Sequence, residues 1–276
     1  MELRKFGNTN EMVSKLGLGG GHLSAVSREE GIKIVDEAFR SGINYFDVAP
    51  SYNDGINESI INESLGGRIK DSFIATKVLA RSYDEAKKEI EGSLKRLGKI
   101  DLLQLHSVDT QEALEVVFSY SGALKAVDEL KNQGIIKYVG ITNHFDPKVL
   151  ESSLQKYKFD SVMMPLGIIG SITTSFENLI EKVGSTAIVG ILILGDNKME
   201  PVAEQAIRYS LALKASTILV GPKTVEELKK DIDIANRFKP LSEPELDELK
   251  SFALNAVRTE SPWWTKGPVG LKHHNQ

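Results

Sequence analysis

Four residues carry side chains that could together move a proton. Asp47 and Tyr52 lie five residues apart in residues 44–52 (NYFDVAPSY), Lys77 ends SFIATK, and His106 follows DLLQL. A phenol has an ordinary pKa near 10, and a lysine cation beside it lowers that pKa by favouring the phenolate. A carboxylate keeps the lysine charged, and a histidine can donate a hydrogen bond to a carbonyl oxygen that gains negative charge. This set suits proton transfer at a carbonyl or alcohol group, and a hydride reaction there would need a bound cofactor.

Each of these side chains lies at or just past an apolar, strand-like run. Taken alone, each could be a turn residue, a strand-end charge or a hydrogen-bonded core histidine. The parallel strands of an α/β barrel end at one rim, where the active sites of such barrels lie. A barrel would therefore bring the four side chains together.

Strand-like and helical patterns alternate along most of the chain. The strand-like runs are residues 15–18, 43–46, 72–76, 101–105, 136–142, 161–164, 187–194 and 217–220. The helical patterns include residues 28–40, 83–97, 124–133, 148–157, 175–183, 202–213, 225–238 and 242–257. Alternating strands and helices give a parallel sheet, and eight strands close it, so we expect a (β/α)8 TIM barrel. A doubly wound open sheet is the alternative. Residues 1–15 predict a β-hairpin before the barrel, with its turn at residues 7–10.

Composition narrows the class of protein. The chain has 276 residues, of which 41% are hydrophobic and 26% charged, and we expect one domain over residues 1–276. A net charge of −4 gives no basic field for nucleic acid, and no apolar run approaches the roughly 18 residues of a membrane span. Without cysteine there is no disulfide or thiolate metal site, which fits a reducing cytoplasm.

Residues 258–276 show no periodicity and predict an irregular tail. Trp263 and Trp264 in this tail could cover a cleft or anchor the tail to the barrel. His273 and His274 are interpreted as surface residues, and no metal site is expected.

Several segments together resemble the aldo-keto reductase superfamily. FDVAPSYNDG resembles its strand-2 signature, SFIATKV its lysine segment and DLLQLHSVD its histidine segment. FGNTNEMVSKLGLGG resembles its N-terminal hairpin, GIIKYVGITNHFDPKVLE its strand-5 block and YSLALKASTILVGPKTVEELKKDI the stretch around strand 8. The resemblance implies a catalytic tetrad of Asp47, Tyr52, Lys77 and His106, and an NADP- or NAD-dependent reduction of an aldehyde or ketone, or its reverse.

The resemblance also implies a set of cofactor-binding positions. They are Gly20, Asp47, Thr142, Asn143, Met163, Ile191, Gly221, Lys223, Thr224, Glu227 and Asp231. Gly20 belongs to a glycine run that lets backbone approach a ligand or simply makes a tight turn. Met163 replaces a glutamine and Ile191 replaces a stacking tyrosine of many members, so we expect looser nicotinamide binding. Lys223 favours the 2′-phosphate of NADP, whereas Glu227 and Asp231 oppose it, so NADP is preferred only slightly and NAD is possible.

Two other functions stay open. One is a barrel lyase or isomerase acting on a sugar or keto acid, with a Schiff base at Lys77 or a redox-neutral hydride shuttle. The other is a cofactor-binding protein without turnover. The expected substrate is a small carbonyl compound or alcohol, and the protein is expected to be a monomer or weak homo-oligomer. The expected cleft lining, which has no decisive charge, is Gly20 to His22, Tyr83, Ser107 to Asp109, His144 and Trp263-Trp264.

Overall fold

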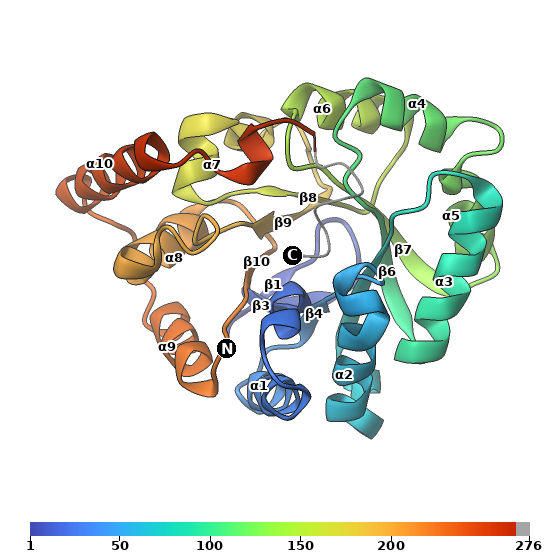
Figure 1. Cartoon of the computed structure of the whole chain (residues 1–276), viewed down its shortest axis with the longest axis horizontal. Helices are drawn as coiled ribbons and strands as arrows, with labels where there is room; N and C mark the ends of the chain where they lie inside the picture. Colours follow the sequence, from blue (N-terminus) through green and yellow to red (C-terminus); the bar gives the residue numbers. More distant parts are fainter. Residues whose placement is uncertain (269–276) are drawn as a thin grey trace.

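A closed barrel of eight parallel strands forms the centre of the computed structural model, which describes residues 1–268 (Figure 1). The strands are β3 (Leu16–Gly19), β4 (Tyr45–Asp47), β5 (Phe73–Val78), β6 (Ile100–Leu105), β7 (Ile136–Thr142), β8 (Ser161–Pro165), β9 (Ala187–Ile191) and β10 (Thr217–Val220). They pair in chain order and β10 closes the ring against β3. The predicted (β/α)8 barrel is confirmed, and the open sheet is wrong.

The barrel is surrounded by helices, most of which connect its strands, while the last two follow β10 (Figure 1). They are α1 (Arg28–Arg40), α2 (Ile56–Leu65), α3 (Tyr83–Leu97), α4 (Gln111–Phe118), α5 (Ala123–Asn132), α6 (Pro147–Lys156), α7 (Ile168–Thr173), α8 (Ala203–Ala212), α9 (Val225–Asn236) and α10 (Glu243–Thr259). Side-chain caps start several of them. Ser27 accepts a hydrogen bond from the amide of Glu30, and Thr224 accepts one from the amide of Glu227. Each such cap satisfies a backbone donor that the first helical turn leaves free.

Two predicted elements differ from the structure. The strand expected over residues 187–194 ends at Ile191, because Leu192 has a φ of +56°, which no strand residue adopts. The helix expected over residues 175–183 is only a 3₁₀ turn, Phe176–Leu179, preceded by Ser175 at a φ of +57°. Apolar spacing alone does not show such left-handed residues.

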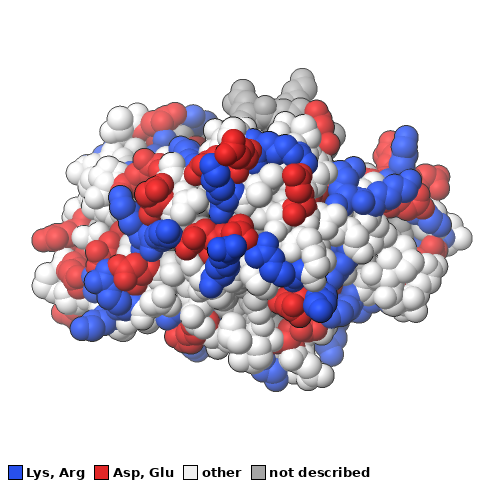
Figure 2. Space-filling view, turned by 90° about the horizontal axis from the view of Figure 1, so that it is seen from below, with Lys and Arg blue, Asp and Glu red and all other residues white. Residues whose placement is uncertain are grey.

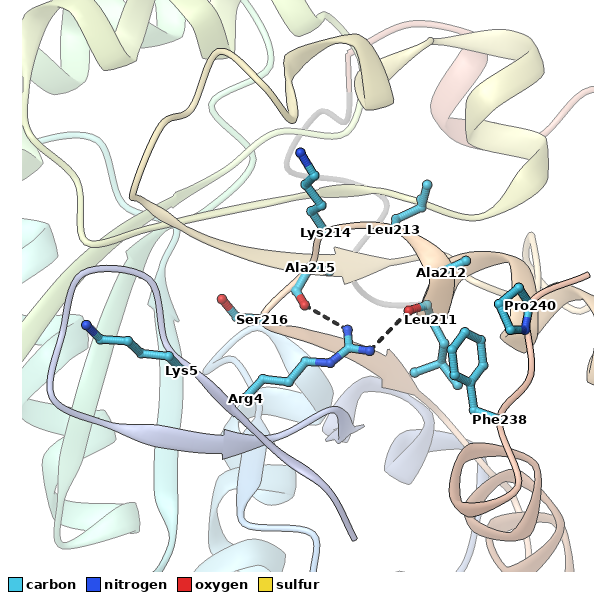
Figure 3. A pocket seen from close by; sticks show the side chains of 10 residues that line it. All are labelled: Arg4, Lys5, Leu211, Ala212, Leu213, Lys214, Ala215, Ser216, Phe238 and Pro240. Carbon is cyan, nitrogen blue, oxygen red and sulfur yellow. Dashed lines mark hydrogen bonds between the residues drawn. The ribbon is translucent and has the colours of Figure 1, made fainter.

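The predicted N-terminal hairpin consists of β1 (Leu3–Lys5) and β2 (Met12–Ser14), paired antiparallel. Its neighbour Phe6 packs into the barrel interior, with its ring centroid 4.8 Å from that of Phe73. Arg4 fastens the hairpin to the segment before β10 by donating to the carbonyls of Ala215 and Leu211 at 2.9 and 3.1 Å. These contacts border a surface pocket of about 500 Å³ at the N-terminal ends of the strands (Figure 3). The pocket therefore lies away from the rim that carries the predicted catalytic residues.

Surface charge is mixed on the face shown in Figure 2, where acidic and basic side chains alternate. Across residues 1–268, no helix is both long and apolar enough to cross a membrane. Within the same residues, no group of three histidine, aspartate or glutamate side chains is arranged to hold a metal ion. His273 and His274 lie outside the described residues.

Candidate active site

Asp47 and Lys77 form a buried ion pair at the carboxyl ends of β4 and β5. Asp47 is the last residue of β4, and Lys77 is the second-last of β5, so both point to one end of the barrel. The ammonium group also donates to the carbonyl of Val48 at 3.0 Å. The two residues are only 3% and 1% exposed, so each charge depends on these protein partners.

Tyr52 reaches the pair from a tightly turned loop. The three residues after it, Asn53, Asp54 and Gly55, all adopt left-handed φ values, of 51°, 50° and 81°. Asparagine, aspartate and glycine are the residue types that tolerate this conformation best. The turn places the Tyr52 ring centroid 5.0 Å from the ammonium nitrogen of Lys77.

His106 completes the group from the end of β6. Its ring lies 6.1 Å from that of Tyr52, centroid to centroid, and the two rings are nearly perpendicular at 83°. The residue is 1% exposed and its amide donates to the carbonyl of Val78 at 2.9 Å. The structure thus brings all four predicted catalytic residues together at one rim.

Burial and neighbouring charges shift the pKa values of this group. Burial would lower the pKa of Lys77, but Asp47 and Tyr52 reverse the effect and raise it, so the amine is a cation. Burial raises the pKa of Asp47, and Lys77 opposes that shift only in part. The pKa of Tyr52 is also raised by burial. Lys77 lowers it, as the sequence analysis expected, but less than burial and Asp47 raise it. The phenol is therefore protonated at neutral pH.

Gln104 belongs to the same group, although it was not among the residues predicted from the sequence. Its side-chain amide donates to the second oxygen of Asp47 at 2.9 Å and is fully buried. Gln104 precedes His106 by two residues, and residues two apart on a strand point to the same side. That alternation was the available signal in DLLQLH.

Thr142 and Asn143, two of the residues expected around the nicotinamide, form hydrogen bonds that hold neighbouring loops together. Thr142 accepts a hydrogen bond from the amide of Ser107 at 2.7 Å. The Asn143 amide group donates to the carbonyl of Val108 at 2.6 Å, and its oxygen accepts from two backbone amides in the next turn. Thr142 and Asn143 still line the same rim as Asp47, but their side chains are already engaged in joining the loops after β6 and β7.

Met163 and Ile191 give this part of the rim an aliphatic character. Met163 is 1% exposed and belongs to the apolar cluster inside the barrel, and the partly buried Ile191 packs against that cluster. A ring can pack on such a surface, although with less defined geometry than on an aromatic side chain. The surface thus fits a flat, partly apolar ring.

Two glycines permit close packing just after β3 and β10, two strands that pair with each other. A Cβ on Gly20 would lie 2.8 Å from the carbonyl oxygen of Asp47, so the glycine run lets backbone approach the catalytic strand. A Cβ on Gly221 would lie 1.9 Å from the ring of His22, which therefore requires glycine there. Both glycines hold neighbouring protein segments close.

The N-terminus of α9 follows the last strand and presents backbone amides, a position at which other barrels bind phosphate. Lys223 lies before it, with a side chain 40% exposed. The Thr224 hydroxyl caps the helix by accepting from the amide of Glu227 at 3.1 Å, and the Glu227 carboxylate accepts from the amide of Lys223, the residue before the cap, at 2.7 Å. Burial and the charge of Glu227 raise the pKa of Asp231 to about 7. This place therefore combines one cation, Lys223, with three acidic residues, Glu200, Glu227 and Asp231.

Comparisons with known proteins agree with this architecture. The model of the aldo/keto reductase family matches residues 15–169. The uncharacterized oxidoreductase YqkF of Bacillus subtilis is 27% identical, with 91% of this chain and 96% of that protein covered. L-galactose dehydrogenase of Arabidopsis thaliana is 26% identical over 87% of this chain and 90% of that protein.

Solved structures show the same fold. The holo form of aldo-keto reductase AKR11C1 from Bacillus halodurans superposes with a TM-score of 0.74, at 24% identity and full coverage of both chains. The fold, the order of the strands and the match over more than half of the chain point the same way. The chain belongs to the aldo/keto reductase family.

Proposed function

We propose that this protein is an oxidoreductase that reduces an aldehyde or ketone to an alcohol, or catalyses the reverse reaction, with a nicotinamide dinucleotide. The observation that carries this proposal is the group formed by buried Asp47, Lys77 and His106 at the carboxyl ends of β4 to β6 and by the partly exposed Tyr52 in the loop after β4. Family membership supports it.

Tyr52 acts as the proton donor in the direction of reduction. Its raised pKa keeps the phenol protonated at neutral pH, so it can give its proton to the oxygen of the carbonyl group. Lys77 then stabilises the phenolate, and Asp47 keeps Lys77 charged in this buried place. His106, beside Tyr52, directs the substrate oxygen to the phenol. When bound, the dinucleotide supplies the hydride in reduction and accepts it in oxidation.

The residues of the rim fit either dinucleotide. Thr142, Asn143, Met163 and Ile191 would border the nicotinamide, with an aliphatic surface in place of an aromatic one. Lys223 and the first amides of α9 would hold phosphate, with Gly221 beside them. Because Glu227 already accepts from the amide of Lys223, we expect NADP to be preferred over NAD only slightly.

The Schiff-base alternative is disfavoured by the state of Lys77. A Schiff base requires a neutral amine that can reach the substrate. Lys77 is 1% exposed, paired with Asp47 and bonded to the carbonyl of Val48, and its pKa is raised. Incubation with keto acids and borohydride, followed by mass spectrometry, should give no adduct on Lys77.

Substitution of Tyr52 by phenylalanine tests the proposal. Tyr52→Phe keeps the ring beside Lys77 and removes the proton, so we expect kcat for aldehyde reduction to fall by about 10³-fold. The affinity for NADPH and NADH, measured by quenching of tryptophan fluorescence, should change by less than about threefold, since the hydroxyl contributes at most one hydrogen bond to dinucleotide binding. Turnover within tenfold of the wild type would contradict the role of Tyr52. Cofactor binding by the wild type without hydride transfer to any of a panel of aldehydes and ketones would favour the non-turnover alternative.

A further inference from the structure

His144 is a second histidine at the catalytic rim, and the reaction described above gives it no task. It follows Asn143 at the end of β7, and its side chain is 9% exposed. Its backbone amide donates to Asp109 at 2.7 Å. Its ring nitrogen Nδ1 lies 3.3 Å from the hydroxyl of Ser107 and 3.6 Å from the carboxylate of Asp109. The loop after β6 therefore fixes the imidazole through one of its two nitrogens.

The imidazole of His144 also faces the catalytic group. Its centroid lies 6.2 Å from that of His106, whose ring in turn contacts Tyr52. The ring centroid of Trp263 lies 5.9 Å from that of His144. His144 thus lines the space next to the reacting carbonyl group.

The second nitrogen of the ring, Nε2, is the one that can meet a substrate. Both polar contacts that the described residues make with the imidazole go to Nδ1. A polar atom in a largely buried place is normally hydrogen-bonded, because leaving it unpaired costs about 1–3 kcal/mol. A substrate atom beside the reacting carbonyl could provide that partner, and the partly exposed side chain leaves access to it.

We propose that Nε2 of His144 binds a second oxygen of the substrate, so that the enzyme selects carbonyl compounds with a hydroxyl or oxo group on the neighbouring carbon. This inference rests on the proposed function, since it concerns the substrate of the same site. His106 receives the reacting oxygen, and His144 receives the neighbouring one. A site that forms such a hydrogen bond discriminates against the analogue that lacks the oxygen, because its own polar group is then left unpaired.

The test compares two aldehydes that differ in one hydroxyl group, 2-hydroxypropanal and propanal. In the wild type we expect kcat/KM to be about 10–100-fold higher for 2-hydroxypropanal, the value of one well-formed hydrogen bond at a buried site. Two variants of His144 distinguish the roles of the two ring nitrogens. In His144→Asn the amide takes the place of Nδ1 and keeps the contacts with Ser107 and Asp109. In His144→Gln the amide reaches the place of Nε2.

We expect His144→Asn to lose the preference and His144→Gln to keep most of it. If His144→Asn lowers kcat/KM equally for both aldehydes, the imidazole only braces the loop after β6, and the proposal is wrong. A wild-type enzyme that reduces both aldehydes equally well would overturn it too, while leaving the proposed oxidoreductase function intact.

A binding measurement keeps the two proposals apart. The only tryptophans of the chain are Trp263 and Trp264, and Trp263 lies beside His144, so tryptophan fluorescence reports on this place. Propane-1,2-diol should quench it at about tenfold lower concentration than propan-1-ol in the wild type, and at a similar concentration in His144→Asn. This difference without turnover of any carbonyl compound would support the role of His144 and contradict the proposed function. Equal quenching by both alcohols in the wild type would contradict the role of His144.

Discussion

Asp47 and Asp231 are both buried carboxylates, 3% and 7% exposed, but their surroundings differ. Asp47 has a lysine cation on one oxygen and the amide of Gln104 on the other. The charged neighbour that acts on Asp231 is another carboxylate, Glu227, one helical turn earlier. Burial raises the pKa of both acids, and Lys77 opposes the rise at Asp47 whereas Glu227 adds to it at Asp231.

This difference separates the two halves of the site. At the rim, Asp47 and Tyr52 raise the pKa of Lys77, and Lys77 opposes the rise that burial causes in the pKa values of Asp47 and Tyr52. At the N-terminus of α9 like charges meet, and a bound phosphate would bring a further negative charge to them. We therefore expect the loss of a charge beside Asp47 to destabilise the protein. The loss of a negative charge in α9 should instead relieve the repulsion between carboxylates.

Removal of the lysine cation should have the largest effect. Lys77→Met leaves Asp47 buried without its counter-charge, which costs about 3–5 kcal/mol in the free energy of unfolding when one partner of a buried pair is lost. Urea denaturation measures that loss. The double variant Asp47→Asn with Lys77→Met should recover part of it, because the buried charge is then gone. A loss below about 1 kcal/mol in the single variant, within the range of surface ion pairs, would show that the pair contributes little to the fold.

Neutralising Asp231 should have the opposite sign. Its pKa is about 7 in the folded protein against an ordinary value of 3.8, so the folded state holds a proton that the unfolded state has released between these pH values. Stability therefore falls as pH rises from about 4 to about 7 and is constant above, by up to roughly 4 kcal/mol over this window. Asp231→Asn removes that penalty.

The pH dependence provides its own control. The melting temperature of Asp231→Asn should exceed that of the wild type at pH 8, and the two should converge below about pH 3, where the wild-type carboxyl is largely protonated in both states. An equal difference at both pH values would instead indicate a change in packing or hydrogen bonding.

Sequence patterns predicted the barrel well, because eight apolar runs at regular spacing allow few other folds. The bounds predicted for β7 and β10 agree with the structure. The end of β9 does not, since the run continues as leucine and isoleucine through a left-handed turn at Leu192 that side-chain types do not reveal.

The candidate site was predictable to a similar depth. Asp47, Lys77 and His106 converge because each lies at or next to a strand end, and Tyr52 joins them from the loop after β4. The roles proposed for these residues remain predictions. Gln104 could have been predicted from its position two residues before His106, since alternate strand residues point to the same side. The hydrogen bond between the amide of His144 and Asp109 could not be predicted in this way, because the two residues are 35 positions apart in the sequence. Such contacts follow from the packing of two loops and leave no local pattern.

The smallest effect is expected from Glu227, and it concerns cofactor choice. Glu227→Gln keeps an acceptor for the amide of Lys223, since the glutamine side chain also has a carbonyl oxygen, and removes one negative charge near Lys223. The ratio of the dissociation constants for NADH and NADPH should then shift about fivefold towards NADPH, as expected for one screened charge near a phosphate. Added salt should shrink this shift, because the groups are exposed.

Glu226→Gln, in the same helical turn, is the matched control, since Glu226 has no hydrogen bond or ion pair with Lys223 among residues 1–268. It should change the ratio less than twofold. Equal shifts in both variants would mean that the total charge of α9 sets the preference for NADPH over NADH. The hydrogen bond between the Glu227 carboxylate and the amide of Lys223 would then have no particular role.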